Sequence, residues 1–387
     1  MPQSKLPAVF MRGGTSKAVI FHARDLPTAR SAWGPIFLAL MGSPDPNFRQ
    51  LDGMGGGLSS LSKVCVIGPP THPEADLDYT FAQILIDKAR VDYGGNCGNM
   101  SSAIGPFAVD EGIVPKPEGN QAIVRIHNTN TRKLIVSRFP MEGGAAAVAG
   151  DLTVDGVAGS GAPIRLEFIE PGGARTGRLL PTGNAADMLD VAGLGRVPAS
   201  LIDAANPCVF VPAHAIGATA TESPTEIDNN RALMSRLEAI RRCAAVAMGL
   251  VPDLAKAADV THPFVAFVAP PVAMTTLSSR ALAPSEMDIS TRVISNGQAH
   301  RATPLTGALC LAVAARIPGS IPAEMARRPG GEANLIRIAH PSGLTLVDAK
   351  VATGQGRIEP LAEYAAVYRT ARRLFEGRVL YRTPSEA

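Results

Sequence analysis

The second half of the chain repeats, in short matches, the order of strands and helices found in the first half. The run Phe264-Val-Ala-Phe-Val-Ala-Pro-Pro271 resembles Lys63-Val-Cys-Val-Ile-Gly-Pro-Pro70, and Leu335-Ile-Arg-Ile338 resembles Ile123-Val-Arg-Ile126. A helix of buried type beginning at Thr306 stands where the helix after Cys97 stands. The sequence therefore predicts a duplicated mixed domain, which would place two helix N-termini face to face across a cleft suited to a ligand with two or more carboxylates.

The stretch Tyr93-Gly-Gly-Asn-Cys-Gly-Asn-Met-Ser-Ser-Ala-Ile104 joins a strand-like run to a predicted helix over 100–112. Cys97 is expected near the helix N-terminus, where unpaired backbone N–H groups favour a thiolate or a bound carboxylate. The flanking glycines leave room for a ligand to approach the backbone. The alternative is an unreactive cysteine in a tight buried turn.

Three other segments carry polar groups that can bind a small anion. The run 8–21 is predicted to be a hairpin whose turn carries Arg12, Thr15 and Ser16, although Arg12 can also be a solvated turn charge. The loop 49–57 lacks the spacing of a dinucleotide fingerprint, and close approach of a small anion to its glycine backbone is expected instead. Lys63 opens an apolar strand, either as an ordinary edge charge or as a partly desolvated amine.

Composition limits the class of protein. With 387 residues, two domains sharing a cleft are expected, joined between Pro181 and Pro198. A net charge of +3 without a dense basic run argues against nucleic acid as a partner. Five widely spaced cysteines favour a reducing compartment, and neither a signal core nor a membrane-spanning apolar run is present, so a cytoplasmic protein without a membrane partner is expected. A strand over 205–211 and an amphipathic helix over 231–250, packed through Leu233, Leu237 and Ile240, are also predicted.

Seven strings distributed from residue 11 onward resemble the PrpF family, which includes 2-methylaconitate cis–trans isomerase, 3-methylitaconate Δ-isomerase and 4-oxalomesaconate tautomerase. The segments 71–83, 126–130 and 206–208 are most similar to the methylitaconate isomerase branch. The supporting strings are Met11-Arg-Gly-Gly-Thr-Ser-Lys17, Gly42-Ser-Pro-Asp45, Asp52-Gly-Met-Gly-Gly56, Ser62-Lys63, Gly95-Asn-Cys-Gly-Asn99, Pro181-Thr-Gly-Asn184 and Thr370-Ala-Arg372.

The resemblance implies an α+β, diaminopimelate epimerase-like fold: two similar domains, 1–184 and 185–387, each a mostly antiparallel sheet rolled around a central helix. It implies Lys63 and Cys97 as catalytic residues. The epimerases of this fold use a second cysteine, but the corresponding place here is Thr306 or a neighbour. Cys310 lies one turn inside the helix, which argues against two-cysteine racemisation. Candidate substrate-binding residues are Arg12, Thr15, Ser16, Gly55, Gly56, Asn96, Gly98, Asn99, Thr182, Gly183, Asn184, His300, Arg301 and Thr306.

The expected activity is a cofactor-independent isomerisation, an allylic double-bond shift or a cis–trans change, in a small unsaturated di- or tricarboxylate such as 3-methylitaconate, 2-methylaconitate or aconitate. Lys63 and Cys97 can exchange the roles of base and acid. No metal is expected because no ligand spacing matches a metal site. Three alternatives stay open: a 4-oxalomesaconate tautomerase, a cysteine hydrolase and a non-catalytic polycarboxylate-binding accessory protein. A homodimer is compatible with the sequence.

Overall fold

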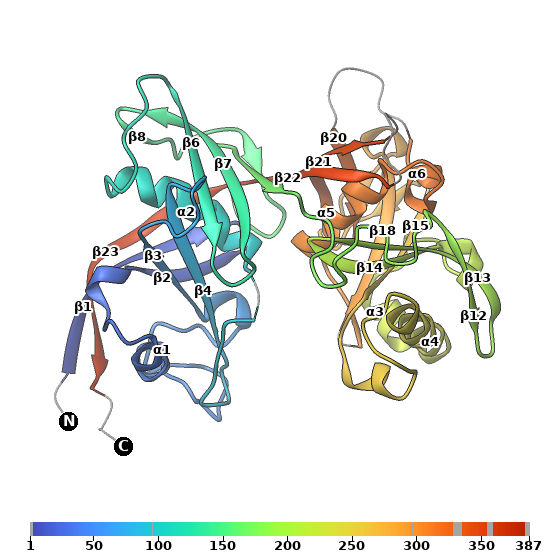
Figure 1. Cartoon of the computed structure of the whole chain (residues 1–387), viewed down its shortest axis with the longest axis horizontal. Coiled ribbons are helices and arrows are strands. Elements are labelled where there is room, and N and C mark those ends of the chain that lie inside the picture. Colours follow the sequence, from blue (N-terminus) through green and yellow to red (C-terminus); the bar gives the residue numbers. More distant parts are fainter. Residues whose placement is uncertain (1–2, 95, 296, 328–334, 354–358, 384–387) are drawn as a thin grey trace. The chain divides into compact units, whose positions relative to one another are not determined.

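The computed structural model describes residues 3–94, 96–295, 297–327, 335–353 and 359–383, and the chain divides into two compact units (Figure 1). The first unit contains Met1–Glu167 and Tyr368–Ala387, and the second contains Phe168–Val367. The sequence predicts a single crossing at 184/185, whereas residues 168–184 belong to the second unit and the last strand returns to the first. The return occurs because β23 (Ala371–Arg382) pairs antiparallel with β1 (Gln3–Gly13) along nearly its whole length.

The first unit is a continuous sheet in the order β23-β1-β2-β3-β4-β6-β7. The β2–β3 and β4–β6 pairs are parallel, and the other pairs are antiparallel. The short strands β5 and β8 pair antiparallel with β4 and β7, and β9 pairs with β10. The strands are β2 (Ser16–His22), β3 (Lys63–Gly68), β4 (Leu77–Ile84), β5 (Val91–Asp92), β6 (Gln121–Asn128), β7 (Lys133–Glu142), β8 (Ala145–Ala146), β9 (Leu152–Thr153) and β10 (Ser160–Gly161).

Two helices cover the opposite faces of this sheet (Figure 1). Helix α1 (Trp33–Met41) packs on alternate residues of β2 and β3, among them Phe21 and Val64. It begins four residues later than the predicted helix 29–41, after a 3-10 turn. Helix α2 (Gly98–Asp110) is buried on nearly every side and contacts β1, β2, β6, β7, β8 and β23. The sheet therefore wraps around α2, as the fold prediction requires.

The second unit repeats the pairing order of the first. The order β13-β14-β15-β18-β20-β21 shows the same alternation of antiparallel and parallel pairs as β1-β2-β3-β4-β6-β7. Helix α5 (Leu305–Ala314) occupies the place of α2, and α4 (Arg231–Ala247) with α3 (Pro224–Asn229) occupies that of α1. The predicted duplication and the α+β class are confirmed.

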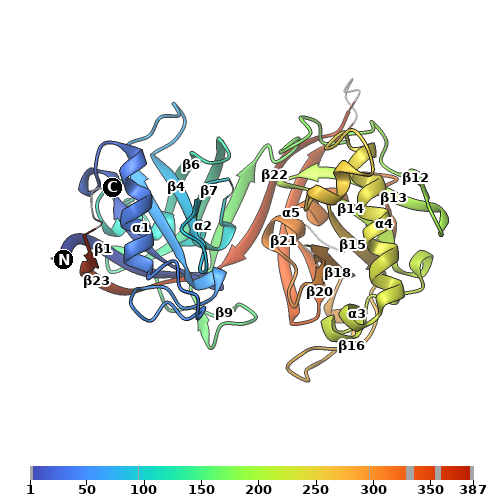
Figure 2. The ribbon, with the colours of Figure 1, turned by 90° about the horizontal axis from the view of Figure 1, so that it is seen from below.

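The other strands and helices complete the second unit, and β11 and β22 each contain residues of both units. The predicted strand 205–211 corresponds to β14, and the predicted helix 231–250 corresponds to α4 (Figure 2). Leu233, Leu237 and Ile240 of α4 are buried, as predicted. The elements are β11 (Ile164–Ile169), β12 (Asp187–Val191), β13 (Gly195–Ala204), β14 (Asn206–Pro212), β15 (Phe264–Ala269), β16 (Met274–Thr275), β17 (Ala281–Leu282), β18 (Ile289–Ser295), β19 (Gln298–Ala299), α6 (Ile321–Met325), β20 (Leu335–His340), β21 (Gly343–Ala352) and β22 (Leu361–Arg369).

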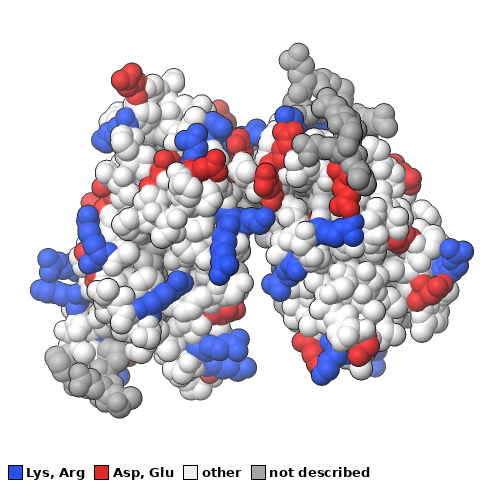
Figure 3. All heavy atoms as spheres, in the orientation of Figure 1, with Lys and Arg blue, Asp and Glu red and all other residues white. Residues whose placement is uncertain are grey.

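Charged side chains are spread over the surface in small groups. On the face drawn in Figure 3, Lys and Arg side chains lie among uncharged residues, with Asp and Glu between them. Among the described residues, no helix is both long and apolar enough to cross a bilayer. The expected lack of a nucleic-acid partner stays a prediction.

Candidate active site

Cys97 is the residue that caps the N-terminus of α2, as the sequence predicts. Its backbone is extended, with φ −104° and ψ 96°, and its carbonyl accepts the Ser101 N–H at 2.9 Å. The thiol makes no capping hydrogen bond and is half-exposed. The N–H groups of Gly98, Asn99 and Met100 precede the first intrahelical bond and are available to an anion. Gly95, part of the predicted motif, lies outside the described residues.

Asn96 is held in one orientation by a buried asparagine of β6. The Asn128 side chain is fully buried, and its Oδ1 accepts the N–H of Thr131 at 2.9 Å and the Thr131 hydroxyl at 2.8 Å. Its Nδ2 must therefore donate, and it donates to Asn96 Oδ1 at 3.2 Å. The Ser101 hydroxyl donates to the same oxygen at 3.3 Å. The NH2 group of Asn96 consequently points away from this network and can donate to a ligand.

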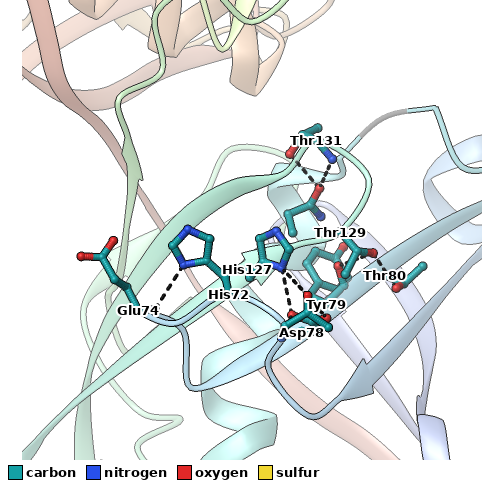
Figure 4. Close-up of polar contacts among 10 residues, drawn as sticks. His72, Glu74, Asp78, Tyr79, Thr80, His127, Thr129 and Thr131 are labelled. Carbon is teal, nitrogen blue, oxygen red and sulfur yellow. Dashed lines mark hydrogen bonds and ion pairs between the residues drawn. The ribbon is translucent and has the colours of Figure 1, made fainter.

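The strands β4 and β6 carry the rest of this polar network, drawn in Figure 4. His127 Nδ1 lies 2.9 Å from Asp78 Oδ1, and Thr71 Oγ1 donates to Asp78 Oδ2 at 2.7 Å. The hydroxyls of Thr80 and Thr129 are 2.7 Å apart. The segments 71–83 and 126–130, which the sequence relates only by resemblance, are therefore joined by side-chain hydrogen bonds.

A second side-chain amide fixes the start of that loop. Asn130 Oδ1 accepts the Phe81 N–H at 2.8 Å, and its Nδ2 donates to the carbonyls of Phe81 at 2.9 Å and Tyr93 at 2.7 Å. Asn130 thus ties Tyr93, two residues before the Gly-Asn-Cys-Gly-Asn motif, to β4. The sequence alone does not reveal that Asn128 and Asn130 hold this loop, because Asn96, Phe81 and Tyr93 lie more than thirty residues away.

The turn between β1 and β2 packs directly on the first turn of α2. A Cβ at Gly13 would lie 2.5 Å from the Asn99 carbonyl, and a Cβ at Gly14, where φ is +50°, would lie 2.3 Å from Asn99 Oδ1. Asn99 Nδ2 donates to Thr15 Oγ1 at 3.1 Å. Ser16, the first residue of β2, is buried. Glycine at 13 and 14 is therefore what lets this turn reach the helix start.

Two arginines lie beneath the same turn. Arg12 Nη1 donates to the carbonyls of Gly14 and Thr370 and to the Thr370 hydroxyl, at 2.9 to 3.0 Å, so this nitrogen closes the turn. Burial, and then the charge of Arg372, lowers the pKa of Arg12. Arg369 Nε donates to Asn99 Oδ1 at 3.2 Å, and burial lowers its pKa to about 10. Within the described residues no carboxylate pairs with Arg369, so a buried positive charge stands beside the start of α2.

Lys63 is a buried amine and not the edge charge that the sequence also allowed. Its side chain is only 7% exposed, its Nζ donates to Gln83 Oε1, and this nitrogen lies 5.1 Å from the centre of the Phe81 ring. Burial raises the pKa of the neighbouring Cys65 thiol, a negative charge at Cys97 raises it further, and the Lys63 charge lowers it. Lys63 and Cys97 therefore both lie near Cys65, on the face of β3 that is turned away from α1.

The glycine-rich loop before β3 has a structural explanation in close packing. A Cβ at Gly55 would lie 2.3 Å from Gln50 Oε1, and a Cβ at Gly56 would lie 2.7 Å from Leu61 Cδ1. The buried Gln50 amide accepts the Ser62 hydroxyl at 2.5 Å, immediately before Lys63. The loop thus fixes the residue that leads into the buried lysine. A role of Gly55 and Gly56 in binding an anion stays a prediction.

We expect Gly53→Ala to destabilise the protein by about 1 to 3 kcal/mol, because the added Cβ would overlap backbone atoms. It would lie 2.2 Å from Gly42 N and 2.3 Å from the carbonyl carbon of Met41, and neither atom can move without displacing the end of α1. Gly34→Ala, in the first turn of α1 with nothing within 4 Å, is the matched control. Urea unfolding of both variants measures the difference, and an equal free energy of unfolding would contradict the packing argument.

The predicted residues of the second unit form two local groups. Thr182 Oγ1 and Asn184 Nδ2 donate to the two oxygens of Asp187, at 2.7 and 2.8 Å, across a turn in which Gly183 has φ +85°. Near α5, His300 Nε2 lies 2.6 Å from Ser295 Oγ, and burial lowers the pKa of His300.

The other two second-unit candidates lie on either side of the start of α5. Arg301 is exposed and Thr306 is the second residue of the helix. Cys310 is buried one turn inside the helix, as predicted. Thr306 therefore corresponds to Asn99 in the first unit, since each is the second residue of its helix. The predicted correspondence of Thr306 with Cys97 is corrected by two residues, because the residue that caps α5 is Pro304.

Comparison with known proteins defines first the class and then the family. A protein described as 3-methylitaconate isomerase, from Eubacterium barkeri, is 40% identical over 97% of each chain. One described as 2-methyl-aconitate isomerase, from Shewanella oneidensis, is 38% identical over 98% of this chain and 97% of its own. The crystal structure of methylitaconate-delta-isomerase superposes with a TM-score of 0.90 at 40% identity, over 98% of this chain and 96% of the other.

These relatives are isomerases, and the shared fold extends over nearly the whole chain, so the protein belongs to this class of enzyme. The family model described as PrpF protein matches residues 3–382. The chain belongs to the PrpF family, and the resemblance noted from its sequence motifs is confirmed.

Proposed function

We propose that this protein catalyses a cofactor-independent 1,3-proton shift or cis–trans isomerisation in a small unsaturated di- or tricarboxylate, with 3-methylitaconate and 2-methylaconitate as the first candidates. Two placements carry the proposal: a buried amine on the face of β3 that is turned away from α1, and a thiol at the start of α2, the helix on that side of the sheet. The names of the relatives support the substrate class.

The reaction begins with removal of a proton from a carbon that is conjugated to a carboxylate through a double bond. The neutral Lys63 amine accepts this proton, the electron pair of the C–H bond enters the conjugated system, and a dienolate forms. Return of a proton from the Lys63 ammonium or the Cys97 thiol to the other end of the allylic system gives the isomer. When the Lys63 ammonium returns the proton, the enzyme is back in its starting protonation state. When the Cys97 thiol donates instead, a proton must pass from the Lys63 ammonium to the Cys97 thiolate, directly or through solvent, before the next turnover. The two residues can also exchange these roles.

Stabilisation of the dienolate requires donors where its negative charge grows. The free N–H groups at the start of α2, the outward NH2 group of Asn96 and the positive charge of Arg369 provide them in the first unit. Because these donors are held by Asn128 and by the β1–β2 turn, little reorganisation is needed as charge develops. The carboxylate-binding roles of Thr15, Ser16, Gly98 and Asn99 follow from the same turn. Thr182, Gly183, Asn184, His300, Arg301 and Thr306 stay candidates on the second unit.

Two alternatives have support from named relatives or from residue types. A relative from Novosphingobium described as (4E)-oxalomesaconate Delta-isomerase is 37% identical over 96% of this chain, so a tautomerase acting on a keto tricarboxylate is the second candidate. A cysteine hydrolase needs a histidine beside its nucleophile. His127 is next to Asn128 on β6, and Asn128 contacts the Cys97 loop through Asn96. Because neighbouring residues of a strand point to opposite faces, the His127 side chain is directed away from that loop, which argues against this use of Cys97. A non-catalytic polycarboxylate-binding protein would bind the same ligands without exchange.

Incubation in deuterated water separates these functions. We expect NMR to detect deuterium at the allylic carbons of at least one of 3-methylitaconate, 2-methylaconitate, aconitate and oxalomesaconate, together with appearance of its isomer, because the proton removed exchanges with solvent. Lys63→Ala protein at the same concentration is the control. Binding without exchange for the whole panel would contradict the proposed function and favour the accessory protein.

A further inference from the structure

Gln83 lies directly opposite Lys63 in the sheet. The antiparallel register of β3 and β4 pairs the two residues, and the Lys63 amine donates to Gln83 Oε1. Gln83 is two residues from Phe81, whose ring also contacts this amine. The sequence alone does not single out Gln83, because only the folded sheet shows which residue lies opposite Lys63.

The side-chain amide of Gln83 can adopt only one orientation. Its Nε2 lies 3.0 Å from the carbonyl oxygen of Ser59 and 3.0 Å from that of Ser62. Carbonyl oxygens only accept hydrogen bonds, so the NH2 group must face them and Oε1 must face Lys63. Ser62 is itself fixed through Gln50. The acceptor for the Lys63 amine is thus held by the backbone that leads into β3.

We propose that Gln83 is the positioning residue of the Lys63 amine: a neutral acceptor that sets the direction of Nζ without stabilising its protonated form as a carboxylate would. This inference rests on the proposed function, in which Lys63 transfers the proton. Within the described part of the chain no Asp or Glu pairs with this amine. The titratable groups nearby are Cys65 on β3 and Cys97 at α2, and Asp92 lies opposite Gln83 on β5. A carboxylate in place of Gln83 would hold the proton more tightly and slow its release.

Two substitutions test this role by moving the pH dependence in opposite directions. Gln83→Glu places a negative charge beside the amine, and we expect the acidic limb of the kcat profile to move up by about one pH unit or more. Gln83→Met keeps the length of the side chain but removes the acceptor. We expect its acidic limb to move down, and kcat at the optimum to fall about 10-fold with KM changed less than kcat, because the amine is no longer aimed. Gln121→Glu, exposed on β6, is the charge-matched control and should leave the profile unchanged.

A second measurement does not depend on turnover. NMR titration of 13C-labelled lysine in the resting protein, with the Lys63 signal assigned from its loss in Lys63→Met, should show the same opposite displacements in the two Gln83 variants. Loosened packing alone would not reverse sign between them. Profiles and titrations that stay at the wild-type pH, or that move in the same direction in both variants, would overturn the role of Gln83. Failure of the proposed function is distinct, because Lys63→Ala would then retain solvent exchange.

Discussion

Lys63→Ala protein is expected to lose about 100- to 10,000-fold in kcat and in the rate of solvent exchange, the contribution typical of a positioned acid or base. The lysine is buried and its amine donates a hydrogen bond to Gln83. The fold should survive, because the substitution removes one hydrogen bond and one cation–π contact, and at the same time removes the cost of burying a charge. We expect the Tm to stay within about 5 °C of wild type.

Lys17→Ala is the matched control for this substitution. Lys17 also lies over an aromatic ring of the same sheet, with its Nζ 5.7 Å from the centre of Phe10. By strand alternation it is on the α1 face, opposite to Lys63. Deuterium incorporation and circular dichroism melting of both variants distinguish a chemical role from a structural one. Full exchange by the Lys63→Ala protein would contradict its assignment as the group that transfers the proton.

Iodoacetamide is expected to modify Cys97 at least about 10-fold faster than any other cysteine, and a bound dicarboxylate should suppress this reaction selectively. Cys65, Cys208 and Cys310 are buried, and burial raises the pKa of Cys65 and of Cys310. The sequence places Cys243 in the core as well, but this prediction is wrong, because the residue is only partly buried on α4. Cys243 is therefore the competing site.

The chemistry of Cys243 still predicts slow alkylation. Burial, and then the nearby Asp190, raises the pKa of Cys243, so less of the reactive thiolate is present near neutral pH. Cys97 instead lies among backbone N–H groups that favour an anion. Mass mapping after brief labelling of wild-type, Cys97→Ser and Cys243→Ser proteins assigns each phase. First labelling of Cys243, or labelling of Cys97 that no polycarboxylate slows, would contradict the position given to the ligand.

The sequence predicted the duplicated fold because the two halves share short apolar runs at corresponding strands. The pairing orders around α2 and α5 confirm this, and the position of Cys97 followed from the same strand-to-helix pattern. The return of β23 to the first unit was missed, because strand alternation does not reveal a partner more than 350 residues away.

The contacts that hold the candidate site could not be predicted from local sequence patterns either. The Asn128 bond to Asn96 and the Arg369 bond to Asn99 join segments that are distant in sequence, and only the folded chain brings these side chains together. The burial of Lys63 was left open for the same reason, since its Gln83 partner and Phe81 ring come from the next strand. Residue types and spacing thus located the candidate groups, and tertiary contacts determined their environment.

The return of β23 has a consequence for the order of events during synthesis. All of 168–367 is synthesised before Arg369, Thr370 and β23, so the residues of the second unit are made while the first unit still lacks a strand. Until then the Asn99 amide has no Arg369 and the Arg12 side chain has no Thr370. The candidate site of the first unit therefore stays incomplete until the last residues of the chain have been translated.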